Sequence, residues 1–215
     1  MPRAAAPARR DRPARRRAPE RTRLEILDAA TAEFSEKGYA GGRVDNIAAR
    51  TRTTKRMIYY YFGGKERLYA AVLERLYGAM RDAEAALDLA SPTPLEALRR
   101  LVEVTFDHHD AHPDLVRLVS VENIRGARTV AASPVIRARN AAIIATLAAL
   151  LARGERDGAF RPGLDPLRLH MLISSFCFYR VSNRHTLGAI FGRDEAGREE
   201  ERRMVTEAVL RYVRP

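Results

Sequence analysis

Residues 43–67 concentrate side chains that can hold the phosphates and base edges of a nucleic acid. Seven basic and two acidic residues fall in this segment. Lys55, Arg56, Tyr59 and Tyr60 are long hydrogen-bond donors that can reach phosphates or base edges in a major groove. Lys65 follows at the start of another helix, where it and free backbone N–H groups can hold one phosphate. These residue types and spacings indicate a DNA-contacting segment.

Two short helices are needed to position these donors. Ile47 and Ala48 lie in the first helix, three or four polar residues form the turn, and Thr54 is a good N-cap for the second helix. Small Ala48 allows the helices to cross closely, while Ile47, Ile58 and Phe62 supply their shared core. The pattern predicts a helix-turn-helix over residues 43–62.

Four consecutive aromatic residues occupy the second helix of this motif. A short helix has no face that buries all of them. We therefore assign Phe62 and part of Tyr61 to the core, and we expect Tyr59 or Tyr60 to contact DNA.

The segment 20–80 resembles the DNA-binding domain of the TetR family of transcriptional regulators. The residues that carry the resemblance are Ile26-Leu27-Asp28-Ala29-Ala30, Phe34, Gly38-Tyr39, Ile47-Ala48, Ile58-Tyr59-Tyr60-Tyr61-Phe62, Lys65-Glu66 and Leu68. The resemblance implies an all-helical homodimer in which three N-terminal helices bind a double-stranded DNA operator. It further implies that the remaining helices dimerise and bind a small-molecule effector. DNA contacts are then expected at Arg43, Thr54, Lys55, Arg56, Tyr59, Tyr60, Tyr61 and Lys65.

Three positions depart from the family pattern. Arg43 replaces the small hydroxyl residue that usually caps the first motif helix, although Gly42 is an acceptable cap and Asp45 favours the helix N-terminus. Arg43 is expected to add a phosphate contact instead. Arg52 replaces the glycine of the turn and Thr53 replaces an aliphatic residue, so we expect an altered turn backbone.

The charge of the 215-residue chain is concentrated near its N-terminus. Of the net charge of +11, residues 1–19 contribute +6, residues 20–42 contribute −2 and residues 43–67 contribute +5, while residues 68–215 sum to only +2. Such a distribution is typical of a nucleic-acid-binding module attached to a neutral body. Residues 1–19 are Ala-, Pro- and Arg-rich, and we predict a disordered basic tail.

Residues 1–19 lack the apolar stretch of a secretory signal, and no apolar run in the chain reaches the length of a membrane span. A single cysteine, Cys177, suits a reducing cytoplasm.

Hydrophobic periodicity and breakers predict an all-α fold of nine helices without a strand. After the N-terminal helix, which Gly38 ends, and the motif, helices are expected near 65–87, 94–111, 113–126, 134–157, 166–187 and 196–213. We divide the chain into a tail (1–19), a DNA-binding domain (20–80) and an effector-binding and dimerisation domain (81–215).

The last two helices are predicted to form the dimer interface. Apolar residues surround the helix 166–187, which indicates burial both in its own chain and against a partner. The interface candidates are Phe176, Phe178, Met204 and Val209; the alternative is a helix that is merely central in the monomer. The effector pocket is expected among the middle helices, with Phe106, His109, Asn123 and Tyr179 as mixed polar and aromatic candidates.

Other functions have weaker support. His108 and His112 could share a zinc ion, but Pro113 places His112 at a helix end, so we expect no metal and no cofactor. No nucleophile-elbow or phosphate-loop spacing is present, which argues against an enzyme. Two alternative functions remain: a DNA-binding protein without a ligand, and an all-helical enzyme centred on Asp107, His108 and His109.

Overall fold

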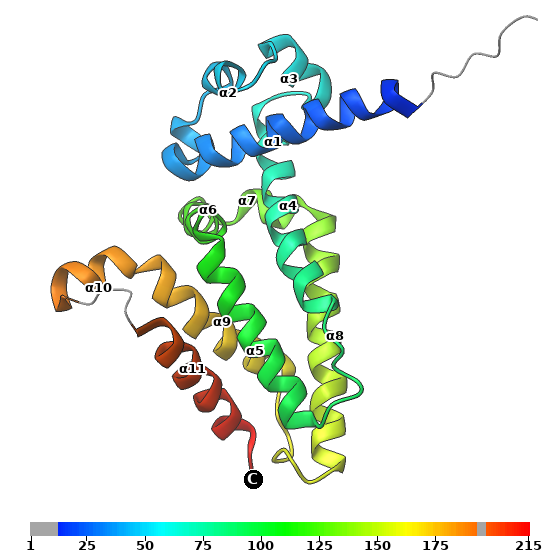
Figure 1. The fold of residues 1–215 in the computed structure, drawn as a ribbon, viewed down its shortest axis with the longest axis vertical. Coiled ribbons are helices and arrows are strands. Elements are labelled where there is room, and N and C mark those ends of the chain that lie inside the picture. The colour runs from blue at the N-terminus through cyan, green and yellow to red at the C-terminus, as the bar shows by residue number, and fades with distance from the viewer. Residues whose placement is uncertain (1–12, 193–196) are drawn as a thin grey trace, which may run out of the picture. The chain divides into compact units, whose positions relative to one another are not determined.

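The computed structural model describes residues 13–192 and 197–215, which form helices connected by turns and loops, with no strand among them (Figure 1). The predicted all-α class is confirmed. The helices are α1 (Pro13–Gly41), α2 (Val44–Arg50), α3 (Lys55–Phe62), α4 (Lys65–Ala85), α5 (Pro94–Ala111), α6 (Pro113–Ile124), α7 (Arg128–Ala132), α8 (Pro134–Arg156), α9 (Pro166–Ser182), α10 (Arg184–Phe191) and α11 (Arg198–Val213).

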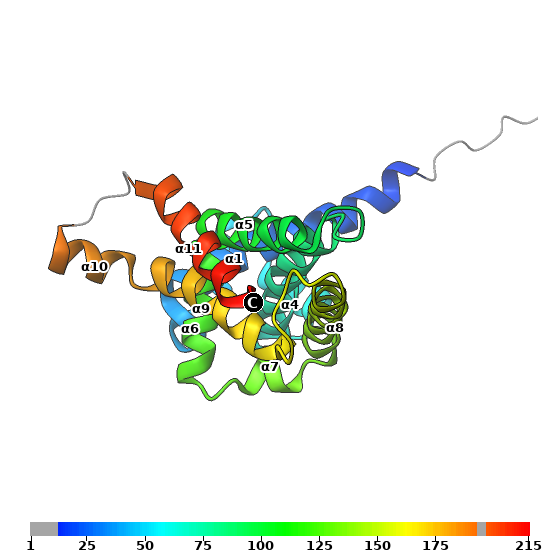
Figure 2. The same ribbon diagram turned by 90° about the horizontal axis from the view of Figure 1, so that it is seen from below.

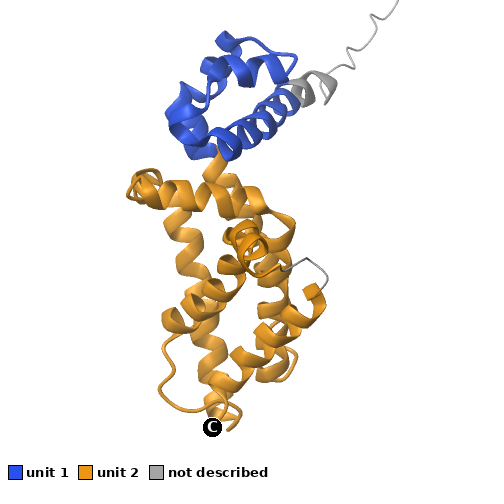
Figure 3. Ribbon diagram, turned by 90° about the vertical axis from the view of Figure 1, so that its left-hand side faces the viewer, with its two compact units in different colours: residues 1–71 blue, residues 72–215 orange. Residues whose placement is uncertain are grey.

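The chain divides into two compact units, residues 1–71 and 72–215 (Figure 3). The division falls inside α4, a helix that is continuous from Lys65 to Ala85. The predicted DNA-binding domain, 20–80, therefore extends beyond the first unit. No breaker marks the division, because the same helix contributes to both units.

Unit 1 packs α1, α2, α3 and the start of α4 around aromatic and aliphatic side chains. Phe34 and Tyr69 are fully buried and meet edge to face, with ring centroids 5.1 Å apart. Ile47 of α2 and Ile58 of α3 are also fully buried, as the motif predicted. Gly38 interrupts α1 at φ 66° and ψ 178°, a conformation that is essentially restricted to glycine. The predicted helix end at Gly38 is thus a sharp kink, after which one more helical turn reaches Gly41.

The predicted disordered tail needs a correction at its C-terminal end. Residues 1–12 lie outside the described residues, but α1 already begins at Pro13 rather than near Glu20. Proline is favoured in the first turn of a helix, and the Ala and Arg residues that follow it have high helix propensity. Residues 13–19, which we assigned to the tail, therefore lie within α1.

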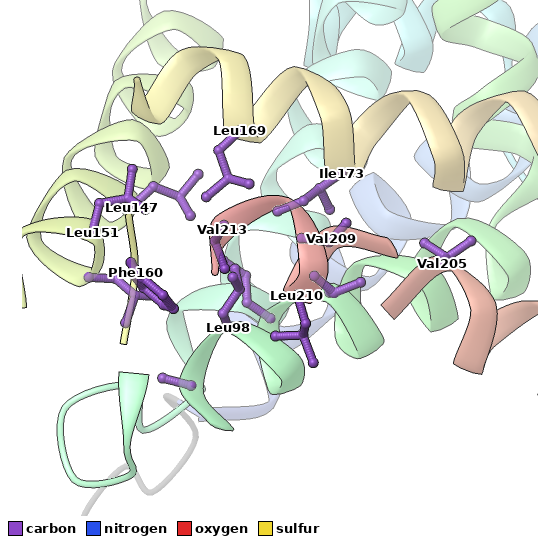
Figure 4. Close-up of a cluster of buried hydrophobic side chains, with 14 of the residues drawn as sticks. Leu98, Leu147, Leu151, Phe160, Leu169, Ile173, Val205, Val209, Leu210 and Val213 are labelled. Carbon is purple, nitrogen blue, oxygen red and sulfur yellow. The ribbon is translucent and has the colours of Figure 1, made fainter. Parts of the chain in front are cut away.

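Unit 2 is built around a core shared by α5, α8, α9 and α11 (Figures 2 and 4). Phe160, in the turn after α8, is 2% exposed and packs directly over Gly154. A Cβ atom at Gly154 would lie 1.9 Å from the Phe160 ring, so only glycine allows this contact. The turn is closed by backbone hydrogen bonds from Ala159 and Phe160 to the Gly154 carbonyl, at 2.9 and 3.0 Å.

Two boundaries in unit 2 differ from the prediction. The expected helix 166–187 is two helices, because the side chains of Ser182 and Asn183 both donate to the Tyr179 carbonyl at 3.2 Å and compete with the helical bonds. The short helix α7 was not predicted. It forms because the buried carboxylate of Glu122, on the preceding helix, accepts hydrogen bonds from the backbone N–H groups of Thr129 and Val130.

Helix α8 is long and apolar enough to cross a membrane by length and composition alone, which the sequence analysis did not anticipate. The hydropathy comes mainly from isoleucine and leucine residues in the stretch 141–152, in which Thr146 is the one polar residue. One face carries core residues such as Leu147 and Leu151, and α8 packs against α5 and α9. Arg139 pairs with Asp82 at 2.6 Å, so the same helix also carries paired charges.

Candidate DNA-binding interface and ligand pocket

A buried carboxylate organises the start of α2. Glu33 of α1 is fully buried, and its Oε1 accepts hydrogen bonds from the Arg43 backbone N–H at 3.1 Å and the Asn46 amide at 2.8 Å. Its Oε2 lies 3.3 Å from Arg50 Nη2. Arg43 is the N-cap of α2 and makes no side-chain capping bond. Glu33 therefore satisfies the donor of the cap residue, which explains how the helix forms without the usual hydroxyl residue.

The turn between the motif helices accommodates its unusual residues without strain. Arg52 and Thr53 both have negative φ values, since Ala127 is the one non-glycine residue with positive φ in the described part of the chain. A glycine is therefore not required at Arg52. Thr54 caps α3, as predicted, by accepting a hydrogen bond from the Met57 backbone N–H at 3.3 Å.

Helix α3 presents its donors on one face and its apolar residues on the other. Tyr59 is 47% exposed and Tyr60 is 77% exposed, while Ile58 and Phe62 are buried and Tyr61 is half-buried. This distribution matches the predicted division of the four aromatic residues between core and surface.

The two basic residues that begin α3 are also exposed. Lys55 lies 3.0 Å from Asp45 of α2. The Asp45 carboxylate accepts a hydrogen bond from Lys55 and, with its charge, raises the pKa of that lysine. Both side chains are more than half exposed, so a phosphate or base can replace this partner at little cost.

Lys65 is held at the first turn of α4, next to the helix N-terminus. Its ammonium group donates to the Ala40 carbonyl at 3.3 Å and lies 4.8 Å from the centroid of the Tyr39 ring. The two preceding glycines have φ values of 74° and 141°, which ends α3 and starts α4 within two residues. Lys65 and the first-turn backbone N–H groups of α4 are therefore adjacent in the sequence and in space, as the predicted phosphate site requires.

Unit 2 contains a pocket of about 440 Å³ among its middle helices. It is lined by Tyr77, Met80 and Arg81 of α4, His109 of α5, Leu115, Val119 and Asn123 of α6, Asn140 of α8, and His170, Met171, Ser174, Ser175 and Phe178 of α9. Mixed aromatic and polar walls of this kind are typical of small-molecule sites.

Two of the four predicted pocket residues, His109 and Asn123, line this cavity. Phe106 does not: it is fully buried, with the Arg180 guanidinium 4.1 Å from its ring centroid. Tyr179 is 58% exposed and lies outside the pocket. The reason is helical phase, because Tyr179 is one residue away from Phe178 and so points about 100° around α9.

Buried polar groups lie at and behind the pocket wall that α4 and α5 form. Arg81 is 8% exposed and pairs with Glu84, 3% exposed, at 2.7 Å. Thr105 donates a hydrogen bond to Glu84 at 3.3 Å. Burial lowers the pKa of His109 and lowers that of His170 to about 4, so both rings are neutral near pH 7.

The groups proposed for the enzymatic and zinc alternatives do not converge. Asp107 forms ion pairs with two arginines of α11, with Arg198 Nη2 at 2.6 Å and Arg202 Nη2 at 3.2 Å. The His109 ring instead bonds to the backbone of its own helix. His108 and His112 stack with centroids 4.1 Å apart, and His112 caps the end of α5. The described residues contain no group of three or more side chains placed to hold a metal ion.

The four predicted interface residues have different positions. Phe176 and Met204 are 37% and 56% exposed, so both are available to a partner. Phe178 is half-buried and lines the pocket instead. Val209 is fully buried in the core of its own chain, among the side chains labelled in Figure 4, so its assignment to the interface was wrong. The alternative, a monomer-core position, holds for Val209.

Sequence reasoning missed Glu33 and most of the pocket. A charged residue among the apolar positions of α1, between Ala30 and Phe34, was the available signal for Glu33. For the pocket, His170, Ser174 and Phe178 follow at four-residue intervals beside the buried row Leu169, Ile173 and Cys177. That register places a polar and aromatic stripe at the edge of the core.

Comparison with known proteins gives matches over both units. Residues 26–72 match the family described as "Bacterial regulatory proteins, tetR family", and residues 94–209 match "Tetracyclin repressor-like, C-terminal domain". The HTH-type transcriptional repressor NicS of Pseudomonas putida is 36% identical over 180 residues, covering 84% of this chain and 85% of that protein. The HTH-type transcriptional regulator RutR of Escherichia coli is 27% identical over 206 residues, 94% of each chain. The structure of SCO4942 from Streptomyces coelicolor has a TM-score of 0.72 and 31% identity, covering 90% of this chain and 99% of that one.

Proposed function

Because the chain belongs to the TetR family and is a DNA-binding transcriptional regulator rather than an enzyme, we propose that it is a repressor that a small molecule releases from its operator. The observation that carries the proposal is the exposed face of α3, where Arg56, Tyr59 and Tyr60 point to solvent from a helix fixed by Thr54, Ile58 and Phe62. This is the arrangement of a recognition helix.

A homodimer on a palindromic operator would place two copies of α3 in successive major grooves, about 34–36 Å apart. Exposed apolar side chains on the last helices support a dimer. Phe176 and Tyr179 of α9 are 37% and 58% exposed, and Met204 and Tyr212 of α11 are 56% and 39% exposed. Aromatic residues and methionine are enriched at protein interfaces, and a two-fold axis would bury each of them twice.

Helix α4 carries both a predicted DNA contact and part of the pocket wall. Its first turn carries Lys65, and its later turns contribute Tyr77, Met80 and Arg81 to the pocket wall. A ligand that shifts the pocket end of a continuous helix also shifts its other end. In a dimer this motion would change the spacing of the two recognition helices and release the DNA.

The dimer is tested by light scattering. Met204→Asp places an unpaired charge in the interface of both subunits, and we expect a folded monomer with weak half-site binding. Arg203→Asp changes an exposed neighbour and is expected to leave the dimer intact. A stable Met204→Asp dimer with full operator affinity would place the interface elsewhere.

Effector release is tested by screening small molecules for loss of operator binding, measured by fluorescence anisotropy. Ser174→Phe fills part of the pocket. We expect this variant to bind the operator normally and to stay bound when the active compound is added. Arg168→Phe, at an exposed position on the same helix, is the matched control. Release that persists in Ser174→Phe would exclude this pocket, and a lack of any releasing compound would favour a DNA-binding protein without a ligand.

A further inference from the structure

We infer that the effector is an uncharged aromatic molecule that donates a hydrogen bond, from a hydroxyl or ring N–H group, to Nε2 of His109. The inference rests on the proposed function, since it names the chemistry of the ligand that the pocket would take. It follows from three features of the cavity: the fixed tautomer of one imidazole, the way neighbouring side chains use their donors, and the balance of charge.

The tautomer of His109 is determined by its backbone partner. Nδ1 lies 2.8 Å from the Thr105 carbonyl oxygen, which can only accept a hydrogen bond, so Nδ1 carries the hydrogen. Burial lowers the pKa of this imidazole, which is therefore neutral and carries no second hydrogen. Nε2 is then an acceptor. The residue is 5% exposed and lines the pocket, so a ligand can reach an acceptor that bulk water barely can.

Two neighbouring polar side chains donate hydrogen bonds to backbone carbonyls of their own helices. Asn140 donates to the Ile136 carbonyl at 2.8 Å, and Ser175 donates to the Leu172 carbonyl at 2.9 Å. Each keeps its oxygen available for a ligand, as an amide carbonyl in Asn140 and as hydroxyl lone pairs in Ser175. Asn140 is half-buried whereas Ser175 is exposed, so the Asn140 oxygen, together with Nε2 of His109, favours a ligand that brings a donor.

The charge balance of the lining disfavours a strongly charged ligand. Arg81 is the one lining residue with a permanent charge, and Glu84 already neutralises it at 2.7 Å. Glu84 binds only Nη1, and the buried Nε of Arg81 has no hydrogen-bond partner among the described residues, so a carboxylate would gain a donor there but would place its charge beside the Glu84 carboxylate. A cation would approach the same guanidinium without a counterion of its own. An uncharged ligand leaves this buried pair intact, and breaking such a pair is strongly destabilising.

Aromatic and flexible apolar groups complete the site. The rings of Phe178 and His109 meet edge to face, with centroids 6.4 Å apart and an interplanar angle of 83°. Tyr77 and Met80 supply further aromatic and polarisable surface from α4. A cavity of about 440 Å³ has room for a small ring system. Shape, polarity and charge thus agree on one ligand class.

The test uses probes of matched shape and measures their dissociation constants with the full-length protein by calorimetry. Resorcinol has two hydroxyl donors, 3-methoxyphenol has one, and 1,3-dimethoxybenzene has none, while benzoate adds a negative charge. We expect resorcinol and 3-methoxyphenol to bind about tenfold more tightly than 1,3-dimethoxybenzene, since only the last probe cannot donate the buried hydrogen bond to His109. Benzoate is expected to bind more weakly than resorcinol.

Variants of His109 locate the hydrogen bond. His109→Phe removes the acceptor, and we expect the preference for resorcinol over 1,3-dimethoxybenzene to disappear. His109→Gln can donate its amide to Thr105 and offer its carbonyl oxygen to the ligand, so the preference should return. A general loss of pocket structure would also abolish the preference, but it would not let the preference return in His109→Gln, so the pair of variants separates the two causes.

Several results would overturn the inference. They are tighter binding of benzoate or 1,3-dimethoxybenzene than of resorcinol, no binding of either hydroxylated probe at millimolar concentration, and an unchanged preference in His109→Phe. Operator release is measured separately. If a compound of another chemical class releases the operator through this pocket, the ligand class is wrong and the proposed function stands. If the probes show the predicted preference but no compound releases DNA, the proposed function is wrong and the pocket chemistry stands.

Discussion

Gly42→Ala tests how the helix-turn-helix is positioned. A Cβ atom at Gly42 would lie 2.6 and 2.8 Å from two carbon atoms of the Phe34 ring. Contacts this short cannot persist, and the ring has little room to move because it is fully buried and packed edge to face on Tyr69. Gly42 has a negative φ, so the substitution introduces no backbone strain and its effect comes from the contact alone.

The adjacent glycine provides a matched control. A Cβ atom at Gly41 would meet the Lys37 Cβ at 3.3 Å, which a small shift relieves. Overpacking a well-packed core costs about 1–3 kcal/mol, and we expect Gly42→Ala to lower the free energy of unfolding by that amount. For a chain of this length the melting temperature should fall by roughly 2–10 °C. Gly41→Ala should change it little.

Operator affinity should follow the same pattern, because Gly42 immediately precedes the N-cap of α2. Thermal unfolding is followed by circular dichroism and DNA binding by fluorescence anisotropy. The reasoning is refuted if Gly42→Ala keeps the melting temperature and affinity of the unmodified protein. Equal losses in the two variants would also refute it, because the close approach to Phe34 occurs at only one of the two positions.

Three further predictions follow from individual contacts. Lys65→Ala should weaken binding to all DNA sequences alike and reduce the log–log salt slope by about 1, measured by anisotropy at several salt concentrations; an unchanged slope in a folded variant would exclude a phosphate contact. Gly154→Ala should displace the Phe160 ring and destabilise the protein by about 3–5 kcal/mol in denaturant titration, whereas a loss below 1 kcal/mol would mean that the ring has another position. Burial lowers the pKa of His108 and His170 to about 4. The unfolded chain therefore binds more protons between pH 6.5 and 4, so stability should fall as the pH falls through that range. Replacing both histidines with glutamine should flatten the dependence, and an equally steep profile would assign it to other groups.

The sequence was sufficient for the elements that local chemistry determines. Thr54 and Gly38 mark helix ends by their own capping and backbone preferences, and both act where predicted. The exposure of Tyr60 and the burial of Phe62 follow from helical periodicity alone. Ser133 and Asp165 are caps of the same kind, since each side chain accepts a hydrogen bond in the first turn of its helix.

Features that depend on distant partners could not be predicted. Helix α7 requires the carboxylate of Glu122, and the start of α2 requires that of Glu33, which lies ten residues before Arg43. The pocket combines five helices, so its lining depends on their relative rotation. Val209 shows the same limit, because periodicity identifies an apolar face without indicating whether that face meets the chain's own core or a partner.

The most direct measurement of the central claim is sequencing of DNA fragments selected by the purified protein. We expect one enriched palindrome with half-sites separated by about one helical turn or a multiple of it. Selection with Arg56→Ala should relax one base position in each half-site symmetrically, at a cost of about 1–3 kcal/mol if that side chain contacts a base edge. Lys55→Ala is tested in parallel on the same face. Absence of any enriched sequence, or a ranking of operator variants that neither substitution changes, would show that this face of α3 does not recognise DNA.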